Sequence, residues 1–400
     1  MKCISFGKVN RKFLIPIIGG VIVLIHEYIL KLIPKNKIAL TNPFIAIIYC
    51  DIGMILAFIP YLILKYRSKK QIIISKELQD KSKLDVELIV QEDIFKKRKF
   101  NKYLFIFISA LMDFGQILLV NFLYKGCVYN LWIFDIIFMN LFSYLILKTK
   151  LYKHQYFSII ILIILGFLLN IIYYYKSDDK ENGLDFVPIL IKFLYEIVLS
   201  LTMVIIKYNM EKNYCNPYEV CIWEGIIELI LISICFIVVI KLEVTIKGVE
   251  YPKSVKDYFG DYDIYDFLVF FADILLHCIY NVFLLLTCYY FTPCHILIIW
   301  IIQELRNYFG INKDLVLNIL GILTLILITC MFLIFIEIIE LNFFNISYNT
   351  KNNVERRSIF ESFNGNNIHL NNEQNDDDDE EEEEETDIVN ASVSSLVGNP

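Results

Sequence analysis

The amino-acid sequence predicts an all-α integral membrane protein with ten transmembrane helices, and composition, run length and charge placement all favour this fold class. Of the 400 residues, 57% are hydrophobic and the mean hydropathy is +0.55, whereas a soluble chain of this size needs more polar surface. The apolar residues fall in runs of about twenty, the length of helix that crosses a hydrocarbon layer roughly 30 Å thick. Because backbone groups inside lipid must bond within their own segment, and the alternating pattern of a barrel strand is absent, the runs are expected to be helices.

Ten ranges have the length and composition of a membrane span. In chain order they are 13–33, 43–64, 103–124, 128–147, 156–175, 187–208, 218–240, 265–290, 294–309 and 315–336. The ninth range is short, and the seventh and eighth carry several charges but stay apolar on balance. The first follows a basic segment, as in a signal peptide, but no small-residue cleavage site ends it, so it is expected to be retained.

Lysine and arginine residues set the expected orientation. The segment 65–102 carries twelve of them and follows the second span, which predicts a cytosolic loop there. An even number of spans then places residues 1–12 and the C-terminus in the cytosol as well. The loop 241–264, which carries charges of both signs, is expected on the lumenal side.

The chain beyond residue 345 has a different composition, rich in Asn, Ser, Asp and Glu. The run Asp376–Glu385 is wholly acidic and accounts for the formal net charge of -7. Such a segment cannot bury enough apolar surface to offset its ordering entropy, so residues 345–400 are predicted to be a disordered acidic tail.

The third and eighth spans match one another at an offset of 160 residues. Asp113 corresponds to Asp273 in this match, and Asn121 corresponds to Asn281. In each span the two residues are eight positions apart, so both side chains lie on nearly the same helix face.

The order of elements extends this match to two halves of the chain, residues 13–175 and 187–336. Each half continues with a tight turn, a fourth span, a short link and a last span with one internal glycine, Gly166 or Gly321. Five spans per half is an odd number, so the two halves are expected to be inverted relative to the membrane. Inverted repeats are typical of carriers, whose substrate site lies near the midplane between the halves.

Polar residues within the spans are the candidates for a substrate or proton cavity, because a charge in lipid costs several kcal/mol unless it faces a cavity or a partner. They are Asp113, Asn121, Asp135, Glu196, Glu224, Asp273, His277, Asn281 and Arg306. If the repeats are inverted, Asp113 and Asp273 are expected to meet across the cavity. Glu228 is expected nearer the membrane edge.

Several of these residues also fit simpler interpretations. Lys192 and Glu196 are one helical turn apart and suit a structural ion pair. Glu304 and Arg306 are equally compatible with the membrane surface. His26 and Glu27 lie close enough to a span end to extend to the surface. His277, one turn from Asp273, fits either a satisfied pair or a proton relay.

Enzyme signatures are absent from the sequence. It contains no GxSxG, HExxH or P-loop motif, and no channel filter of the TVGYG type. The five histidines do not cluster, and the ten cysteines are scattered without a CxxC pair. Accordingly, no catalytic residue, metal or cofactor is expected, nor a nucleic-acid partner. The expected partners are the bilayer, a small solute and, as an open option, protons.

Short motifs in a fixed order connect the chain to a known family. They are Asn42-Pro43-Phe44-Ile45, Ala110-Leu111-Met112-Asp113, Leu151-Tyr152-Lys153-His154-Gln155-Tyr156, Trp223-Glu224-Gly225, Leu305-Arg306 and Ile319-Leu320-Gly321. Over residues 43–336 this order resembles the drug/metabolite transporter superfamily, and within it solute carrier family 35 (F subgroup) and the chloroquine-resistance-transporter-like carriers. The resemblance implies ten spans in two inverted halves and an organelle-membrane transporter of organic solutes.

Three departures from the family pattern are visible. The fourth span has Phe134-Asp135-Ile136 where the family has a basic or small-residue motif, and the ninth span is about two turns short. The loop 243–264 has no cysteine, so the lumenal disulfides of the chloroquine-resistance branch are absent.

The sequence thus predicts a secondary transporter of small organic solutes that works by alternating access. The acidic spans favour a cationic or zwitterionic substrate, with proton coupling left open. One alternative is a nucleotide-sugar transporter, for whose phosphates only Lys192 and Arg306 are candidate ligands. The other alternative, of a different class, is a non-transporting scaffold or receptor that acts through the acidic tail.

Overall fold

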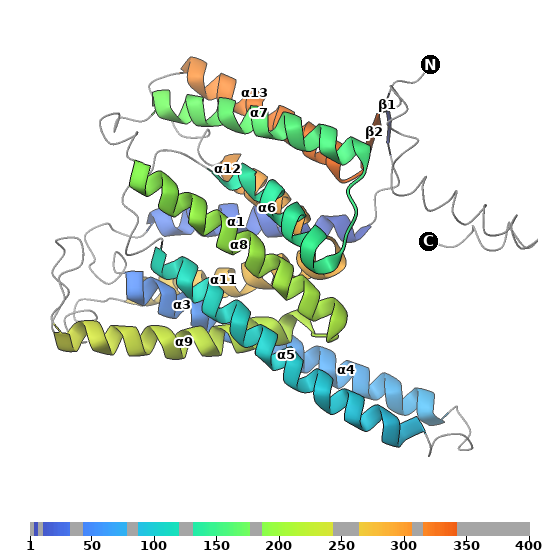
Figure 1. Ribbon diagram of the computed structural model, residues 1–400. Helices are drawn as coiled ribbons and strands as arrows, with labels where there is room; N and C mark the ends of the chain where they lie inside the picture. The colour runs from blue at the N-terminus through green and yellow to red at the C-terminus, as the bar shows by residue number, and fades with distance from the viewer. Residues whose placement is uncertain are drawn as a thin grey trace, which may run out of the picture. The chain divides into compact units, whose positions relative to one another are not determined.

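The computed structural model describes the backbone of residues 4–6, 11–32, 43–77, 87–119, 131–176, 186–242, 264–305 and 315–341 (Figure 1). The chain divides into two units, residues 1–346 and 347–400. The tail predicted over 345–400 lies outside the described residues, as do most of the loop 241–264 and the sequon at Asn345. All that follows concerns the first unit.

The described residues are almost entirely helical. The α-helices are α1 (Leu14–Leu32), α3 (Pro43–Leu56), α4 (Phe58–Glu77), α5 (Glu87–Leu118), α6 (Asp135–Phe142), α7 (Lys153–Lys176), α8 (Phe186–Lys212), α9 (Pro217–Leu242), α11 (Ile264–Tyr290), α12 (Leu297–Glu304) and α13 (Leu315–Phe335). Three short 3-10 helices, η1 (Arg11–Phe13), η3 (Trp132–Phe134) and η5 (Pro293–Ile296), precede α1, α6 and α12, and the π-helix η4 (Ser143–Leu147) follows α6. Two short strands, β1 (Ile4–Phe6) and β2 (Ile339–Leu341), pair antiparallel with Ile4 opposite Leu341.

Membrane-spanning length and composition are found in six helices of the described part of the chain. They cover Ile47–Arg67, Lys153–Tyr175, Val187–Lys212, Pro217–Val238, Phe267–Tyr290 and Leu315–Phe335. The apolar helices Trp132–Leu147 and Pro293–Glu304 are shorter. Large apolar side chains are exposed on the outer faces, for example Ile160, Ile164, Phe267 and Phe271. The protein is therefore a multi-pass α-helical membrane protein, whose outer faces suit lipid contact.

The second predicted span is broken into two helices at Ala57. The N–H of Ala57 donates to the carbonyl of Met54 at 3.1 Å, one residue short of the α-helical bond. Pro60 explains the break, because it has no N–H to donate to Leu56 and its ring crowds that carbonyl. The helix resumes as α4, so the predicted span 43–64 is correct in extent but not in continuity.

Helices replace much of the loop that the sequence predicts over residues 65–102. The helix α4 continues to Glu77, and α5 begins at Glu87 instead of residue 103. Lys, Glu and Gln have good helix propensity, so a helix that leaves the membrane has no reason to end at its boundary. The basic residues are thus largely helical extensions of the second and third spans.

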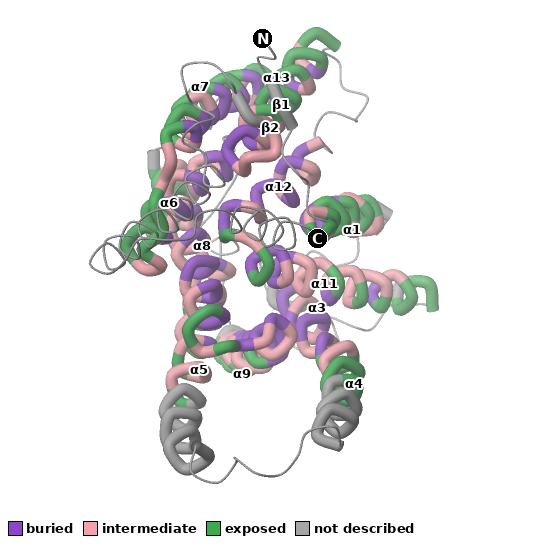
Figure 2. Tube along the Cα trace, turned by 90° about the vertical axis from the view of Figure 1, so that its right-hand side faces the viewer, coloured by how far each residue is buried: buried purple, intermediate pink, exposed green. Residues whose placement is uncertain are grey.

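The helix neighbours follow a matched pattern (Figures 1 and 2). The helix α1 lies against α11 and α12, and α8 correspondingly lies against α5 and α6. The helix α11 lies against α3, as α5 lies against α9, while α3 adjoins α9 and α7 adjoins α13. Each of the first five predicted spans can be matched with the span at the same position among the last five, for example α1 with α8 and α3 with α9. When matched spans are exchanged, each of these neighbour pairs becomes another pair of the same set. The fourth element of each half also has the same form, a 3-10 helix followed by an α-helix of 8 residues.

Two glycines bring α3 into backbone contact with its neighbours. A Cβ at Gly53 would lie 2.8 Å from the carbonyl oxygen of Ile274 on α11. A Cβ at Gly225 on α9 would lie 2.8 Å from the carbonyl oxygen of Asp51 on α3. Since these oxygens belong to helix backbones, neither can move without shifting a whole helix. The three helices α3, α9 and α11 therefore pack at a distance that only glycine permits.

We expect Gly225→Ala to lower the thermal unfolding midpoint in detergent, because overpacking of this kind costs about 1–3 kcal/mol and exceeds the gain in helix propensity. The matched control is Gly115→Ala in α5, where an added Cβ meets no heavy atom within 4 Å. This control should be neutral or slightly stabilising. Equal midpoints for the two variants would contradict the close approach of α3 and α9.

Candidate functional site

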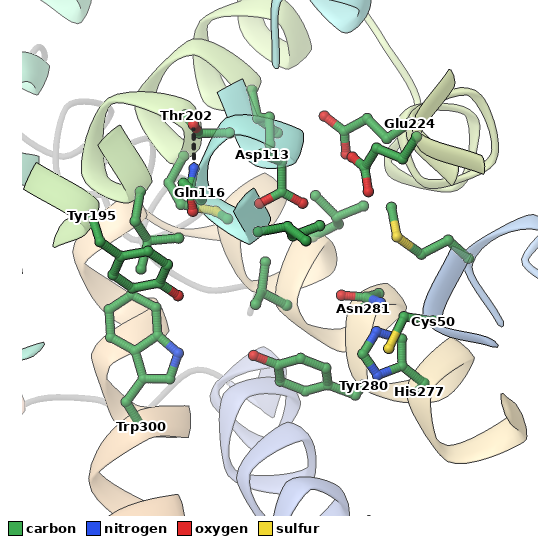
Figure 3. Close-up of a pocket in the computed structure, with 18 of the residues that line it drawn as sticks. Cys50, Asp113, Gln116, Tyr195, Thr202, Glu224, His277, Tyr280, Asn281 and Trp300 are labelled. Carbon is green, nitrogen blue, oxygen red and sulfur yellow. Dashed lines mark hydrogen bonds between the residues drawn. The ribbon is translucent and has the colours of Figure 1, made fainter. Parts of the chain in front are cut away.

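A cavity of about 630 Å³ lies among α3, α5, α6, α8, α9, α11 and α12 (Figure 3). Seven carboxylic acids of the described residues line it: Asp51, Asp113, Asp135, Glu196, Glu224, Glu228 and Glu304. The lining also contains one lysine, Lys192, and the aromatic side chains of Trp132, Tyr195, Tyr280 and Trp300. The charged groups of the walls are thus predominantly acidic, and they are interspersed with aromatic and aliphatic side chains.

Most of the residues that the sequence singles out lie in this cavity. Those that line it are Asp113, Asp135, Glu196, Glu224, His277 and Asn281. Asp273 is not among the lining residues, and Asn121 and Arg306 lie outside the described part of the chain. Asp113 therefore faces the cavity, whereas its counterpart Asp273 has a different neighbour, described below.

Three carboxylic acids form one cluster, here called the three-carboxyl cluster: Asp51 on α3, Asp113 on α5 and Glu228 on α9. The carboxyl of Glu228 lies within hydrogen-bond reach of both Asp51 and Asp113. Asp51 and Glu228 are each only 1% exposed, and neither oxygen of Asp51 has any other hydrogen-bond partner among the described residues. Two carboxyl groups can share a hydrogen bond only when one of them carries a proton. The geometry therefore suits a cluster that holds at least one proton.

Hydroxyl and amide groups position the helices that carry this cluster. Ser109 on α5 donates to the carboxylate of Glu224 on α9 at 2.5 Å. Gln116, two turns along the same helix, donates to the hydroxyl of Thr202 on α8 at 2.9 Å (Figure 3). The helix α5 is thus tied to both of its neighbours by polar contacts inside the bundle.

A second acidic group, here called the Lys192 site, lies on α6 and α8. The ammonium of Lys192 is 2.6 Å from the carboxylate of Glu196 and 4.3 Å from the ring centroid of Tyr195. Asp135, which is fully buried, lies within hydrogen-bond reach of Glu196 and accepts a hydrogen bond from Ser200 at 3.2 Å. The i,i+4 pair that the sequence suggests is present, and it also lines the cavity.

His26 pairs with Asp273 and does not extend to the membrane surface, in contrast to the sequence-based expectation. The Nε2 of His26 on α1 lies 2.7 Å from the carboxylate of Asp273 on α11, and both side chains are mostly buried. The rings of His26 and His277 are 5.7 Å apart. The aspartate on the facing helix provides a closer partner than water, which explains the orientation. The side chain of Glu27 lies outside the described residues.

Three cavity acids were absent from the sequence-based site: Asp51, Glu228 and Glu304. Glu228 lies near the middle of α9 and not at a membrane edge, a position that its place in the range 218–240 already indicates. Glu304 is 7% exposed and accepts a hydrogen bond from Tyr173, so its side chain is buried within the bundle. Asp51 is an acid in mid-span, the same signal that singled out Asp113.

An ion pair at the end of the α5–α9 contact lies where the third and seventh predicted spans begin, with Lys102 just outside the range 103–124. Lys102 bonds to the carboxylate of Glu219, which also accepts from the hydroxyl of Tyr103 at 3.3 Å. Burial alone would lower the pKa of Lys102, but the bond and the charge of Glu219 outweigh it, so the pKa is raised. A raised lysine pKa stabilises the folded state at pH values below the ordinary lysine pKa and loses this effect only as the pH rises through the folded-state pKa. The contact therefore persists throughout the neutral range.

The acids do not come together in a form suited to a metal ion. Within the part of the chain that the structure describes, no group of three or more His, Cys, Asp or Glu residues could hold one.

We expect His26→Ala to destabilise the protein by about 1–3 kcal/mol, because it leaves the mostly buried carboxyl group of Asp273 without its imidazole partner. The double variant His26→Ala with Asp273→Ala should lose less than the sum of the single losses, since the pair is removed together. The measurement is thermal unfolding in detergent, with the exposed Tyr28→Ala on the same helix as control. Additive losses would show that the two side chains do not interact.

The sequence matches no family model and no curated protein. What the cavity binds is therefore inferred from its own side chains.

Proposed function

We propose that the protein is a secondary transporter of small organic solutes with a positively charged group, cationic or zwitterionic, and that it works by alternating access. The observation that carries the proposal is the acidic, aromatic cavity of about 630 Å³ within a membrane-spanning bundle. Its volume is in the range of about 300–1,000 Å³ that is typical of small-molecule sites.

The charge balance of the cavity favours a cation. Among the described lining residues, seven carboxyl groups face one lysine ammonium. Ionised carboxylates in a membrane interior are costly unless they are paired, so an arriving cation relieves a cost that the empty cavity bears. The rings of Tyr195, Tyr280 and Trp300 add faces that attract organic cations (Figure 3). A nucleotide sugar would instead need cations for its phosphates, and Lys192 is already engaged by Glu196.

The matched helix neighbours support alternating access. The pairs α1–α11 and α5–α8, and the pairs α3–α11 and α5–α9, correspond when the two sets of five spans are exchanged. In inverted-repeat carriers such correspondence lets the two halves take each other's conformation, so that a site between them opens to either side in turn. Ten spans in two inverted halves are the architecture that we propose.

The three-carboxyl cluster supports coupling to protons. Its members come from α3, α5 and α9, and the carboxyl group of Glu228 lies within reach of those of Asp51 and Asp113. A group that must hold a proton in one state can release it when a cation or water approaches. Proton exchange for an organic cation would keep the charge of the cavity nearly constant during the cycle.

Family and location are part of the same proposal. The ordered motifs favour the drug/metabolite transporter superfamily, in an endomembrane or organelle membrane, with both termini in the cytosol. The alternative of a scaffold or receptor depends on the acidic tail, which lies outside the described residues.

Uptake by reconstituted liposomes under an imposed pH gradient tests the transport proposal. We expect uptake of amines, polyamines or amino acids but not of nucleotide sugars. Asp51→Asn, Asp113→Asn and Glu228→Gln should each reduce uptake about tenfold or more, because each removes a group that can exchange a proton while changing the side-chain shape little. The sequence-based position of Glu228, nearer the membrane edge, would instead predict a much smaller effect for Glu228→Gln.

Glu211→Gln is the matched control for these variants. Glu211 lies on α8, is exposed and does not line the cavity. Its uptake should equal that of the unmodified protein. Wild-type uptake in all three cluster variants, with unchanged pH dependence, would exclude the cluster from transport. Uptake of nucleotide sugars alone would overturn the choice of substrate class.

Glycosylation in eukaryotic cells tests the orientation. The sequons at Asn345 and Asn390 should remain unmodified, because both are expected in the cytosol. The substitution Pro252→Asn completes a sequon with Ser254 in the expected lumenal loop and should add a glycosidase-sensitive mass. Modification of either natural sequon would reverse the proposed topology.

A further inference from the structure

The ammonium of Lys192 lies where an organic cation would bind best in the cavity. It is 2.6 Å from a carboxylate oxygen of Glu196 and 4.3 Å from the centroid of the Tyr195 ring. A carboxylate combined with an aromatic face is the usual environment of a bound organic ammonium group. Figure 3 shows the Tyr195 ring beside that of Trp300, so the aromatic surface continues beyond the part that Lys192 covers.

The Lys192 site contains a second buried carboxyl group beside that of Glu196. Asp135 lies within hydrogen-bond reach of Glu196, and both residues are at most 1% exposed. One oxygen of Asp135, Oδ2, has no other hydrogen-bond partner among the described residues. Two carboxyl groups so close together hold one proton between them, so the pair carries a single negative charge, which one ammonium group balances.

A second i,i+4 pair on the same helix shows what a purely structural lysine looks like. The ammonium of Lys207 is 3.3 Å from the carboxylate of Glu211 and donates to the backbone carbonyl of Tyr289 at 2.9 Å. Glu211 is exposed, and neither residue lines the cavity. Lys207 thus fastens α8 to α11, whereas Lys192 has its bonds inside the cavity.

Lys192 can leave its position without leaving a buried charge of its own. It is the seventh residue of α8, about two turns from the helix start at Phe186, and its side chain is 21% exposed against 1% for Glu196. A lysine so placed can extend its four-carbon stem toward the membrane surface. The carboxylates, in contrast, are fixed in the interior.

We propose that Lys192 is a built-in occupant of the substrate's ammonium site, and that a cationic substrate binds to Glu196 and Asp135 by displacing it. This inference rests on the proposed transport function and assigns the position that recognises the substrate. The exchange of one cation for another keeps the charge of the site constant. It also allows the empty site to reorient from one side of the membrane to the other, because Lys192 neutralises Glu196 whenever no substrate is bound.

Binding to the purified full-length protein tests the proposal independently of transport. The probe is benzylamine, which is protonated at neutral pH, and the signal is quenching of tryptophan fluorescence, since Trp132 and Trp300 line the cavity. Lys192→Met keeps the stem but removes the competing charge, so the Kd of benzylamine should fall by about tenfold. Lys192→Arg should raise the Kd above that of the wild type, because the guanidinium fork holds carboxylates more firmly. The control Lys207→Met should leave the Kd unchanged.

A second readout separates displacement from a general effect of charge. In liposomes, Lys192→Met should still exchange labelled for unlabelled substrate, because the site is then always occupied. It should lose net uptake, because the empty site cannot reorient while the buried charge of Glu196 is unpaired.

Each other outcome of the binding measurement overturns the inference. Weaker binding to Lys192→Met would show that Lys192 contacts an anionic group of the ligand, and an unchanged Kd would show a structural pair. Equal Kd values for the wild type and Lys192→Arg would show that Lys192 is not displaced, and absence of binding in all variants would show that the site takes no ammonium.

Tighter binding to Lys192→Met without transport of any solute by the wild type would uphold the inference and refute the proposed function. Transport by the wild type with an unchanged Kd in Lys192→Met would do the reverse.

Discussion

The cost of a carboxylate in a membrane interior is the constraint on which the rest of this structure depends. The bundle accommodates its buried acids in three ways. Lys192 pairs with Glu196, the acids of the three-carboxyl cluster lie close enough together for a proton to be shared, and Ser109 donates a hydrogen bond to Glu224. Each of these arrangements lowers the cost without removing it. A cavity maintained in this way is attractive to cations for the same reason that it is difficult to fold.

The two acidic groups lie on different walls of the cavity and differ in their balance of charge. The three-carboxyl cluster on α3, α5 and α9 has no lysine or arginine of the described chain beside it. The Lys192 site on α6 and α8 has an ammonium, a hydroxyl and an aromatic face. In the proposed function, protons and organic cations thus use separate places in one cavity. The proposed coupling would then act through electrostatics across the cavity and not through direct competition for a single group.

The helices and their order could be predicted from the sequence because lipid imposes a simple rule of length and apolarity. The position of Pro60 in the sequence also indicates the break at Ala57. The long extensions of α4 and α5 could not be predicted, because the length of a helix outside the membrane is not set by the thickness of the bilayer. Among the site residues, Asp113, Asp135, Glu196, Glu224, His277 and Asn281 followed from a single argument about polar groups in apolar spans.

Which acids meet could not be predicted in this way. Asp113 and Asp273 occupy matching places, yet one faces the cavity and the other pairs with His26, because α1 supplies a histidine at the point where it crosses α11. Such choices depend on the rotation of each helix about its own axis, and a difference of one residue in register reverses them. Asp51 and Glu228 meet for the same reason, through a contact of α3 with α9 that their spacing in sequence does not reveal.

The backbone contacts at Gly53 and Gly225 bear on how sequence variation in this protein should be interpreted. Both glycines adjoin cavity acids. Gly53 is two residues from Asp51 in the sequence, and Gly225 follows Glu224 and packs against the carbonyl oxygen of Asp51. A mutational scan would find these positions as intolerant as the acids themselves, although neither offers a group to a solute. Intolerance along α3 and α9 therefore records two separate demands, helix spacing and solute chemistry. Only substitutions that preserve shape while changing charge distinguish one demand from the other.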